Sequence, residues 1–200
     1  MTVILDRLTQ GLPRPWRITI DWLVTIIGAI VIVITIKTWA INPYRIPSSS
    51  MEPTLHCARP ASGCQAHFSD RVLACRFCYR LWAPRRGDIV VFHTPPLAAV
   101  RCGSGGTYVK RLIGLPRETW EERGGNIYIN GHLLNEPYIR RERRDSKTIA
   151  PLHIPNGHYF MMGDNRLGSC DSRNWGTVPR RNLIGKVVAT YWPPLRMSIQ

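Results

Sequence analysis

The sequence predicts a mostly β domain joined to one N-terminal apolar helix, and three observations lead to this prediction. An uncharged apolar run lies near the start of the chain, from Trp22 to Ile36. The rest of the chain lacks long helical periodicity and offers short apolar runs bounded by turn residues. Its 16 Gly and 16 Pro are scattered as turn residues, which favours β structure with many corners over a helical bundle.

The apolar run reaches the length of a bilayer span, roughly 20 residues, only if it continues past Lys37 to Ile41. A lysine at that position can extend its amine to the lipid headgroups. We therefore expect an N-terminal tail at 1–21 and a transmembrane anchor at 22–41. A cleaved signal peptide would need small residues just after the run, where the sequence has Thr38-Trp39-Ala40-Ile41. A buried core helix is the other alternative, and the nearly balanced flanking charges do not fix an orientation.

Pro43 pushes the residue before it out of helical geometry, so the helix is expected to end there. One domain is expected to follow at 43–200. Strands are predicted at 89–92, 108–113, 158–162 and 183–192, with a hairpin at 126–134 that turns at Asn130-Gly131. The charge run Arg140–Lys147 is predicted to be a solvated loop.

Three segments of this domain contain candidate catalytic residues. Pro47–Leu55 has three consecutive serines close to the apolar run, which indicates either a polar turn or a nucleophile near the membrane. Met162–Arg173 is either a surface loop or a loop whose hydroxyls and charges orient a catalytic lysine. The third segment, Tyr108–Pro116, places Lys110 among apolar neighbours. An amine buried there would have a lowered pKa and serve as a general base, whereas an edge-strand lysine would simply face water. Lys186 has the same local pattern, so pattern alone does not choose between the two lysines.

The net charge, the histidines and the cysteines narrow the possible partners and cofactors of this chain only when their spacing along the sequence is considered. The net charge of +14 fits a nucleic-acid or anionic-lipid partner, or only a bias towards solubility. Since the basic residues are not interleaved with stacking aromatics and no Gly-rich phosphate loop occurs, we expect no nucleic-acid partner. Histidines show no paired metal spacing, and no metal or cofactor is expected. Cys75-x-x-Cys78, with Cys57 and Cys64 upstream, offers ligands for zinc, but the spacing between Cys57 and Cys64 is loose for that role. A Cys57–Cys64 disulfide is the alternative outside the cytoplasm, and Cys102 and Cys170 have no evident partner.

Four blocks in a fixed order carry a resemblance to a known family. They are IPSSSMEPTL at 46–55, RGDIVVF at 86–92, YVKRLIGLP at 108–116 and GDNR…SCDSR at 163–173. One block alone is moderate evidence, whereas four in order are very specific. Over residues 43–192 the chain resembles the bacterial type I signal peptidases, or leader peptidases. These are membrane-anchored serine proteases with a Ser–Lys dyad and a mostly β catalytic domain of barrel-like or sandwich-like sheets.

The resemblance implies a role for each matched residue. Ser50 is the expected nucleophile and Lys110 the expected general base, in preference to Lys186. The Ser48 hydroxyl and the Ser50 backbone N–H are expected to form the oxyanion hole. The resemblance further implies that Ser169 hydrogen-bonds the lysine amine, that Asp164, Asp171 and Arg173 hold the last block in shape, and that Ile46, Tyr108 and Val109 line the substrate pockets.

The function implied is removal of N-terminal signal peptides from exported preproteins, without a metal or cofactor. The expected protein is a monomer in the plasma (inner) membrane, single-pass, with an extracytoplasmic catalytic domain; its partners are preprotein signal peptides and membrane lipid. Alternatives are a specialised Ser–Lys peptidase that matures one exported protein, a self-cleaving DNA-binding repressor, and a basic membrane module without enzyme activity. The repressor would need a DNA-binding domain where this chain has its apolar run.

Three departures from the family pattern stand out. Leu167-Gly168 replaces an acidic residue and Asn, and Arg117-Glu118 replaces a frequent Gly-Asp. If the second turn needs a positive φ, Arg117 carries a small strain. The stretch 56–68 looks inserted, and it brings Cys57 and Cys64.

Overall fold

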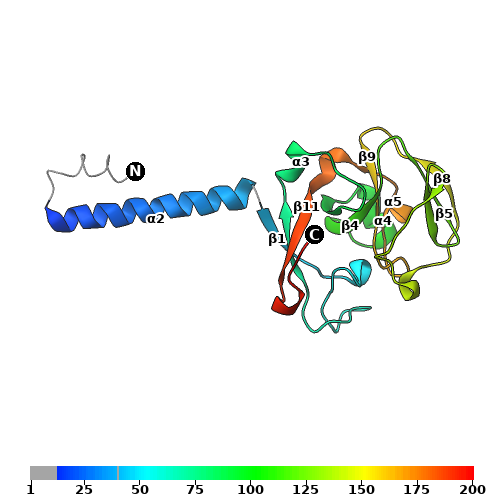
Figure 1. Ribbon diagram of the computed structural model, residues 1–200, viewed down its shortest axis with the longest axis horizontal. Coiled ribbons are helices and arrows are strands. Elements are labelled where there is room, and N and C mark those ends of the chain that lie inside the picture. Colours follow the sequence, from blue (N-terminus) through cyan, green and yellow to red (C-terminus); the bar gives the residue numbers. More distant parts are fainter. Residues whose placement is uncertain (1–12, 40) are drawn as a thin grey trace. The chain divides into compact units, whose positions relative to one another are not determined.

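The computed structural model describes residues 13–39 and 41–200, with the side chains of 35–39 left out (Figure 1). Contacts divide the chain at Ile41 into a helical unit and a β unit that runs from Asn42 to Gln200. Helix α2 (Arg14–Trp39) begins eight residues before the predicted anchor, and its Arg14–Ile34 part is long and apolar enough to cross a membrane. The side chain of Lys37, expected to reach the headgroups, lies outside the described residues.

The β unit contains two sheets, and the strand pairs whose register is described are all antiparallel. The larger sheet has the order β1 (Ile41–Arg45), β2 (Arg71–Cys75), β11 (Leu183–Trp192), β3 (Ile89–His93), β4 (Thr107–Gly114), β9 (His158–Met162) and β10 (Val178–Pro179), with β12 (Ser198–Ile199) beside β11. The smaller sheet has the order β7 (His132–Leu133), β6 (Asn126–Ile129), β5 (Thr119–Arg123) and β8 (Ile149–His153). The prediction of a mostly β fold with one apolar N-terminal helix is confirmed (Figure 1).

Helical structure in the β unit is short. It comprises α3 (Cys78–Leu81), α4 (Pro96–Cys102) and α5 (Ser172–Trp175), and the 3-10 turns η1 (Ser49–Met51), η2 (Arg141–Arg143), η3 (Arg180–Asn182) and η4 (Pro194–Arg196). Helix α4 starts with a proline, which costs no hydrogen bond because the first N–H of a helix has no intrahelical acceptor. The helix ends before Gly103, whose φ is +69°. These short helices join strands and leave the sheets to form the core.

Three apolar clusters make up that core. One joins Met51 and Leu55, just past the serine run, to the buried face of β2 and β3. A second packs under β4 and includes Leu112 and Trp175. The third lies between the sheets, where Trp120 stacks on Phe160 with ring centroids 4.2 Å apart. The serine run is therefore backed by packed core on the side of Met51.

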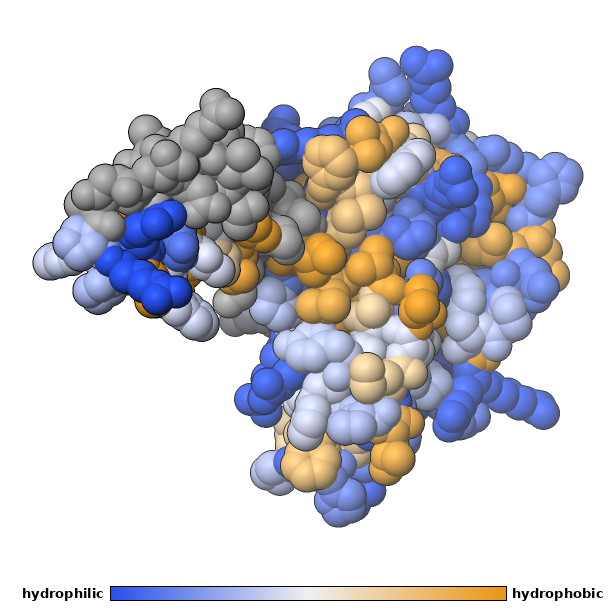
Figure 2. Space-filling model, turned by 60° about the vertical axis from the view of Figure 1, so that its left-hand side comes forward, coloured by the Kyte–Doolittle hydropathy of each residue, from blue (hydrophilic) through white to orange (hydrophobic). Residues whose placement is uncertain are grey.

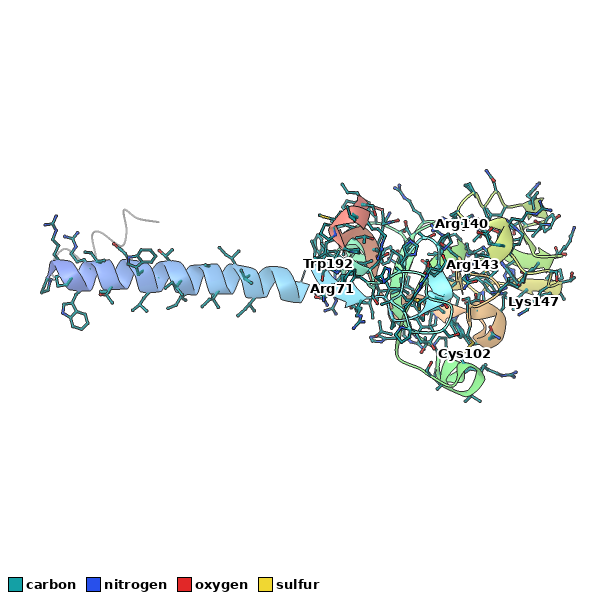
Figure 3. All side chains as sticks on the ribbon, turned by 90° about the horizontal axis from the view of Figure 1, so that it is seen from below. Arg71, Cys102, Arg140, Arg143, Lys147 and Trp192 are labelled. Carbon is teal, nitrogen blue, oxygen red and sulfur yellow. A yellow bond between two sulfur atoms is a disulfide. The ribbon has the colours of Figure 1, made fainter. Side chains whose placement is uncertain are left out.

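The turn predictions are confirmed. Asn130 and Gly131 have φ of +52° and +80°, as a type I′ hairpin requires, and they join β6 to β7. Arg117 has φ +70°, the left-handed conformation that the departure from the family pattern implied. The charge run is only partly solvated: Arg140 and Lys147 are exposed (Figure 3), but Asp145 between them is buried.

All six cysteines are paired. The expected Cys57–Cys64 disulfide is confirmed. Cys75 and Cys78 form a second disulfide, which removes them as zinc ligands. The sequence showed no evident partner for the remaining two, but Cys102 at the end of α4 pairs with Cys170 across 68 residues of chain. That bond joins two loops whose approach depends on the folded sheet, which is why spacing did not predict it.

Candidate active site

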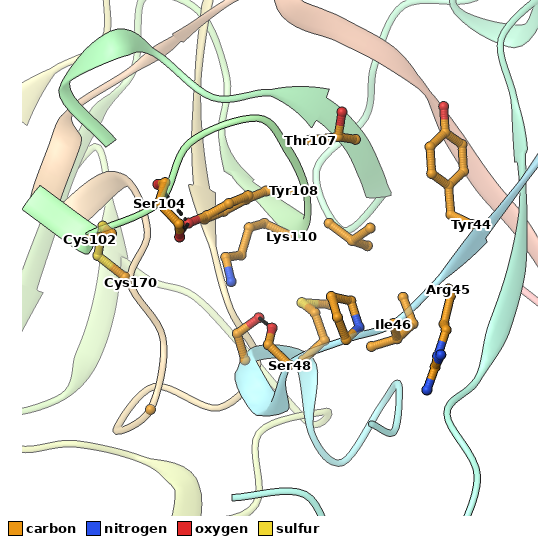
Figure 4. Close-up of a pocket in the computed structure, with 15 residues that line it drawn as sticks. Tyr44, Arg45, Ile46, Ser48, Cys102, Ser104, Thr107, Tyr108, Lys110 and Cys170 are labelled. Atoms are coloured by element: carbon orange, nitrogen blue, oxygen red, sulfur yellow. Dashed lines mark hydrogen bonds between the residues drawn. A yellow bond between two sulfur atoms is a disulfide. The ribbon is translucent and has the colours of Figure 1, made fainter. Parts of the chain in front are cut away.

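A cavity of about 360 Å³ opens between β4 and the segment that follows β1 (Figure 4). Its walls contain the predicted nucleophile and base together with the other predicted pocket residues: Ile46, Ser48, Ser50, Tyr108, Val109 and Lys110. The Cys102–Cys170 disulfide and Gly168 complete another part of the wall. The cavity thus brings together residues that are 60 positions apart in the chain.

Ser50 lies in the middle of the turn η1, and its side chain is held close to a second hydroxyl. The Oγ atoms of Ser48 and Ser50 are 3.2 Å apart, while Ser48 is exposed and Ser50 is nearly buried. Asn165 fixes the turn from the side of the loop after β9. Its backbone N–H donates to the carbonyl of Ser50 at 3.1 Å, and its side-chain amide donates to the carbonyl of Ser49 at 3.1 Å. The serine is therefore presented by a rigid turn.

Lys110 comes from the middle of β4, where it lies opposite Val90 of β3. It is 2% exposed, and its side chain runs towards the Ser48–Ser50 pair in Figure 4. Burial lowers the pKa of the Lys110 amine to about 8, although Asp171 and Asp164 nearby favour its charged form. A lysine with this pKa has an appreciable neutral fraction near pH 7 to 8, and the neutral amine is the form that can accept a proton.

Lys186, which has the same local sequence pattern, is in a different environment. Its amine forms an ion pair with Asp88 at 2.8 Å, and its side chain is 33% exposed. It lines another cavity, beside Tyr79 and Trp82, away from Ser50. The geometry therefore supports Lys110 and not Lys186 as the base, since only Lys110 lines the cavity that contains Ser50.

The loop after β9 approaches Ser50 closely at Gly163. A Cβ atom at this position would lie 2.4 Å from the carbonyl oxygen of Ser50 and 2.2 Å from Ser169 Oγ, so only glycine fits. The Gly163 N–H donates to Asp171 at 3.1 Å. Arg173 donates to Asp171 at 2.9 Å and to Asp145 at 2.5 Å. The predicted Asp171–Arg173 pair is therefore formed, and it holds the loop against Ser50.

Ser169 differs from its predicted role in one respect. Its Oγ atom is buried but has no hydrogen-bond partner, so the expected bond to the Lys110 amine is not formed. The side chain packs against Gly163, beside the Ser50 carbonyl. A buried hydroxyl without a partner is costly.

Asp164 connects three parts of the site. Both of its carboxylate oxygens accept from the Arg111 guanidinium, at 2.8 and 2.6 Å, and Thr54 donates to it at 2.5 Å. Arg111 follows Lys110 on β4, and Thr54 follows the nucleophile turn. This pair is buried, with Asp164 inaccessible and Arg111 8% exposed. The predicted supporting role of Asp164 thus takes the form of a buried bidentate ion pair.

Substituting Asp164 with alanine is expected to lower the free energy of unfolding by about 3–5 kcal/mol, because it leaves the Arg111 guanidinium buried without its counter-charge. Denaturant unfolding of the purified protein measures this change. Glu121→Ala is the control, since it breaks the solvent-exposed pair with Arg123 and is expected to change stability little. An equal effect of the two substitutions would contradict the importance of the buried pair.

Sequence reasoning gave no role to three residues that the structure places in the site's support: Asn165, Arg111 and Glu52. All three lie inside quoted blocks, and Asn165 and Arg111 stand next to residues that were assigned. The polar partners of Asn165 and Arg111 are far along the chain, so only a buried polar residue in an otherwise apolar or conformationally restricted block could have drawn attention to them. Among the described residues, no group of three or more His, Cys, Asp or Glu is arranged to hold a metal ion.

Comparison with known proteins agrees with this geometry. A family model described as "Signal peptidase, peptidase S26" matches residues 19–192. The chain belongs to this family of signal peptidases. It is similar to a probable signal peptidase I-2 of Synechocystis (36% identity, covering 88% of this chain and 74% of the relative) and to a signal peptidase I of Leptolyngbya laminosa (37%, 85% and 78%). A crystal structure of a signal peptidase I from Enterococcus faecalis V583 matches with 34% identity and a TM-score of 0.43, over 53% of this chain and 97% of that one.

The match to the family model includes parts of both the apolar helix and the β unit, since the matched range begins inside α2 and ends with β11. The four blocks that carried the resemblance all lie within this range. The first, third and fourth blocks contribute to the Ser50–Lys110 cavity, and the second contains β3, which pairs with β4 beside Lys110.

Proposed function

We propose that this chain is a membrane-bound signal peptidase I that cuts N-terminal signal peptides from exported preproteins with a Ser50–Lys110 dyad. One observation carries the proposal: a cavity holds a serine on a rigid turn together with a buried lysine whose pKa is lowered to about 8. A serine hydroxyl and a neutral amine in one site are the requirements of acyl transfer by a nucleophile and its base. The names of the relatives, signal peptidase I, support the substrate class.

The reaction follows from these groups. Neutral Lys110 removes the proton from Ser50 Oγ as that oxygen attacks the scissile carbonyl carbon, and the C=O oxygen becomes an oxyanion. The Ser50 N–H and the Ser48 hydroxyl donate to this oxyanion. Protonated Lys110 then gives its proton to the leaving amine as the C–N bond breaks. Lys110, neutral again, takes a proton from the water that attacks the acyl carbon, and it returns this proton to Ser50 Oγ as the ester C–O bond breaks and the acid product leaves. Each oxyanion donor contributes about 3 kcal/mol to lowering the barrier.

The cavity also suits an extended peptide. It lies between residues 44–48, at the end of β1, and residues 107–110 of β4, so an added strand can lie between two stretches of extended chain. Ile46, Tyr108 and Val109 line this cavity. We propose that they select small residues at the first and third positions before the cut.

Several features support a membrane location with residues 43–200 outside the cytoplasm. The Arg14–Ile34 part of α2 has the length and composition of a span, and its residues are not buried inside protein. Three disulfides fit an oxidising compartment. Apolar patches occur among hydrophilic residues on the surface in Figure 2. The exposed large apolar side chains of the β unit include Phe68, Leu195, Met197 and Ile199.

Cleavage of a defined preprotein tests the proposal. The purified full chain in detergent is mixed with a preprotein that has alanine at the first and third positions before the cut, and with a matched preprotein that has tryptophan at the first position. We expect one product, whose N-terminal sequence begins just after the small residue, and no cleavage of the tryptophan substrate, because the proposed selection for small residues at the first position excludes an indole ring. Failure to cut either substrate, or equal cutting of both, would contradict the proposal.

A further inference from the structure

The loop at 56–68, closed by the Cys57–Cys64 disulfide, has no part in the chemistry described above. It nevertheless lies against the nucleophile turn and not out in solvent. Two contacts, one through Glu52 and one through Gly63, join the loop to the residues on either side of Ser50.

Glu52 is the second residue after Ser50, and it is completely buried. Its Oε2 atom lies 2.5 Å from Nδ1 of His56, at the start of the loop. Its Oε1 atom accepts from the backbone N–H of Cys57 at 3.3 Å and from that of Gln65 at 3.5 Å. These two donors lie on opposite sides of the disulfide-closed segment, so one carboxylate gathers both ends of the loop. A buried carboxylate is stable only with such partners.

The second contact is at Gly63, directly before Cys64, which closes the loop. Gly63 has φ +75°, and a Cβ atom there would lie 2.6 Å from Oγ of Ser49, the residue just before the nucleophile. The base of the loop is fixed to the sheet, because Asp70 accepts from the His56 N–H at 2.8 Å and donates its own N–H to the His56 carbonyl at 2.8 Å. The sheet thus holds the base of the loop. The loop contacts the nucleophile turn at two places: its backbone N–H groups donate to Glu52, and Gly63 lies against Ser49.

We infer that Glu52 is a positioning residue for Ser50 and that the disulfide-closed loop 56–68 holds it in place. This inference rests on the proposed function. Asn165 fixes the carbonyls of Ser49 and Ser50 from one side, and the loop fixes Glu52 and Ser49 from the other. Together they set the direction of the Ser50 N–H and Oγ. An oxyanion donor must be aimed at a small target, and a displacement of about 1 Å costs on the order of 10²-fold in rate.

Kinetics of matched disulfide variants test the inference. Cys57→Ala with Cys64→Ala opens the loop, whereas Cys75→Ala with Cys78→Ala opens a short disulfide away from the Ser50 cavity and is the control. We expect the first variant to lose about 10- to 100-fold in kcat with KM changed less than about twofold. The control should keep both constants. The pH at which activity is half-maximal should stay at its wild-type value, because Lys110 is not disturbed.

Variants of Glu52 test the same point without removing a disulfide. Glu52→Ala is expected to lose activity as the opened loop does. Glu52→Gln is expected to recover most of it, since the amide carbonyl still accepts from the Cys57 and Gln65 N–H groups. If Gln is as inactive as Ala, or if the opened loop keeps the kcat of the control, the inference is wrong.

Hydrogen exchange gives a readout that needs no substrate. The peptide that covers residues 46–55 should exchange faster in Glu52→Ala and in the opened loop than in wild type, and should be unchanged in the 75–78 control. Equal exchange in all proteins would overturn the inference even if the wild type is active. If the wild type cuts no preprotein, the proposed function fails, and the exchange result still decides whether the loop holds the turn.

Discussion

Ser50→Ala is expected to lower kcat on the order of 10⁴-fold or more, because loss of the nucleophile in a serine protease leaves only binding and oxyanion stabilisation. Alanine removes the Oγ that lies 3.2 Å from Ser48 and leaves the backbone of η1 unchanged. The carbonyl of Ser50 can still accept from Asn165, so the turn should persist. The variant should therefore bind a signal peptide as the wild type does and fail to cut it.

Gel analysis and N-terminal sequencing of a cleaved preprotein measure this loss, and a binding titration separates it from a loss of affinity. Ser198→Ala provides the matched control: the same substitution on β12, an exposed strand at the sheet edge. Cleavage by Ser50→Ala at the wild-type bond would mean that another group is the nucleophile.

Local sequence rules predicted those parts of the fold that depend on neighbouring residues. The Asn130-Gly131 hairpin belongs to this class, since turn chemistry within a few residues decides it. The positive φ of Arg117 was considered only through the comparison with the family pattern, which frequently has Gly-Asp there. Strands β3, β4, β9 and β11 were also predicted, because short apolar runs bounded by turn residues mark them, whereas β2, β5 and β8 were not. The membership of Ser50 and Lys110 in one site came from the resemblance of four ordered blocks and not from periodicity.

The remaining features depend on residues that meet only in the folded chain. Lys110 and Lys186 have similar local sequences, but the former is buried in β4 and the latter pairs with Asp88 near water. The Cys102–Cys170 bond requires α4 to lie against the loop after β9. Asp145 was assigned to a solvated charge run, yet Arg173 draws it inside. In each case a distant partner changes the environment of a residue whose immediate neighbours suggest something else.

Lys110→Ala is expected to abolish cleavage to an extent similar to Ser50→Ala, since residues that act as one catalytic unit do not contribute additively. Lys110→Arg should be equally inactive, because a guanidinium cannot give up its proton at working pH. Lys186→Ala is the matched control, and it should cut the same bond at nearly the wild-type rate. Activity of Lys110→Ala together with inactivity of Lys186→Ala would reverse the assignment of the base.

The pH dependence of kcat/KM distinguishes a lysine base from a lysine that only shapes the site. The pKa of Lys110 is lowered to about 8, chiefly by burial, so the amine loses its proton as the pH rises through that value. Activity should therefore increase about tenfold per pH unit below 8 and level off above it. A lysine in water would keep its proton to about pH 10.4, which would place the rise more than two pH units higher. A rate that stays constant from acid through neutral pH would rule out deprotonation of Lys110 as the activating step, since the neutral amine is scarce there.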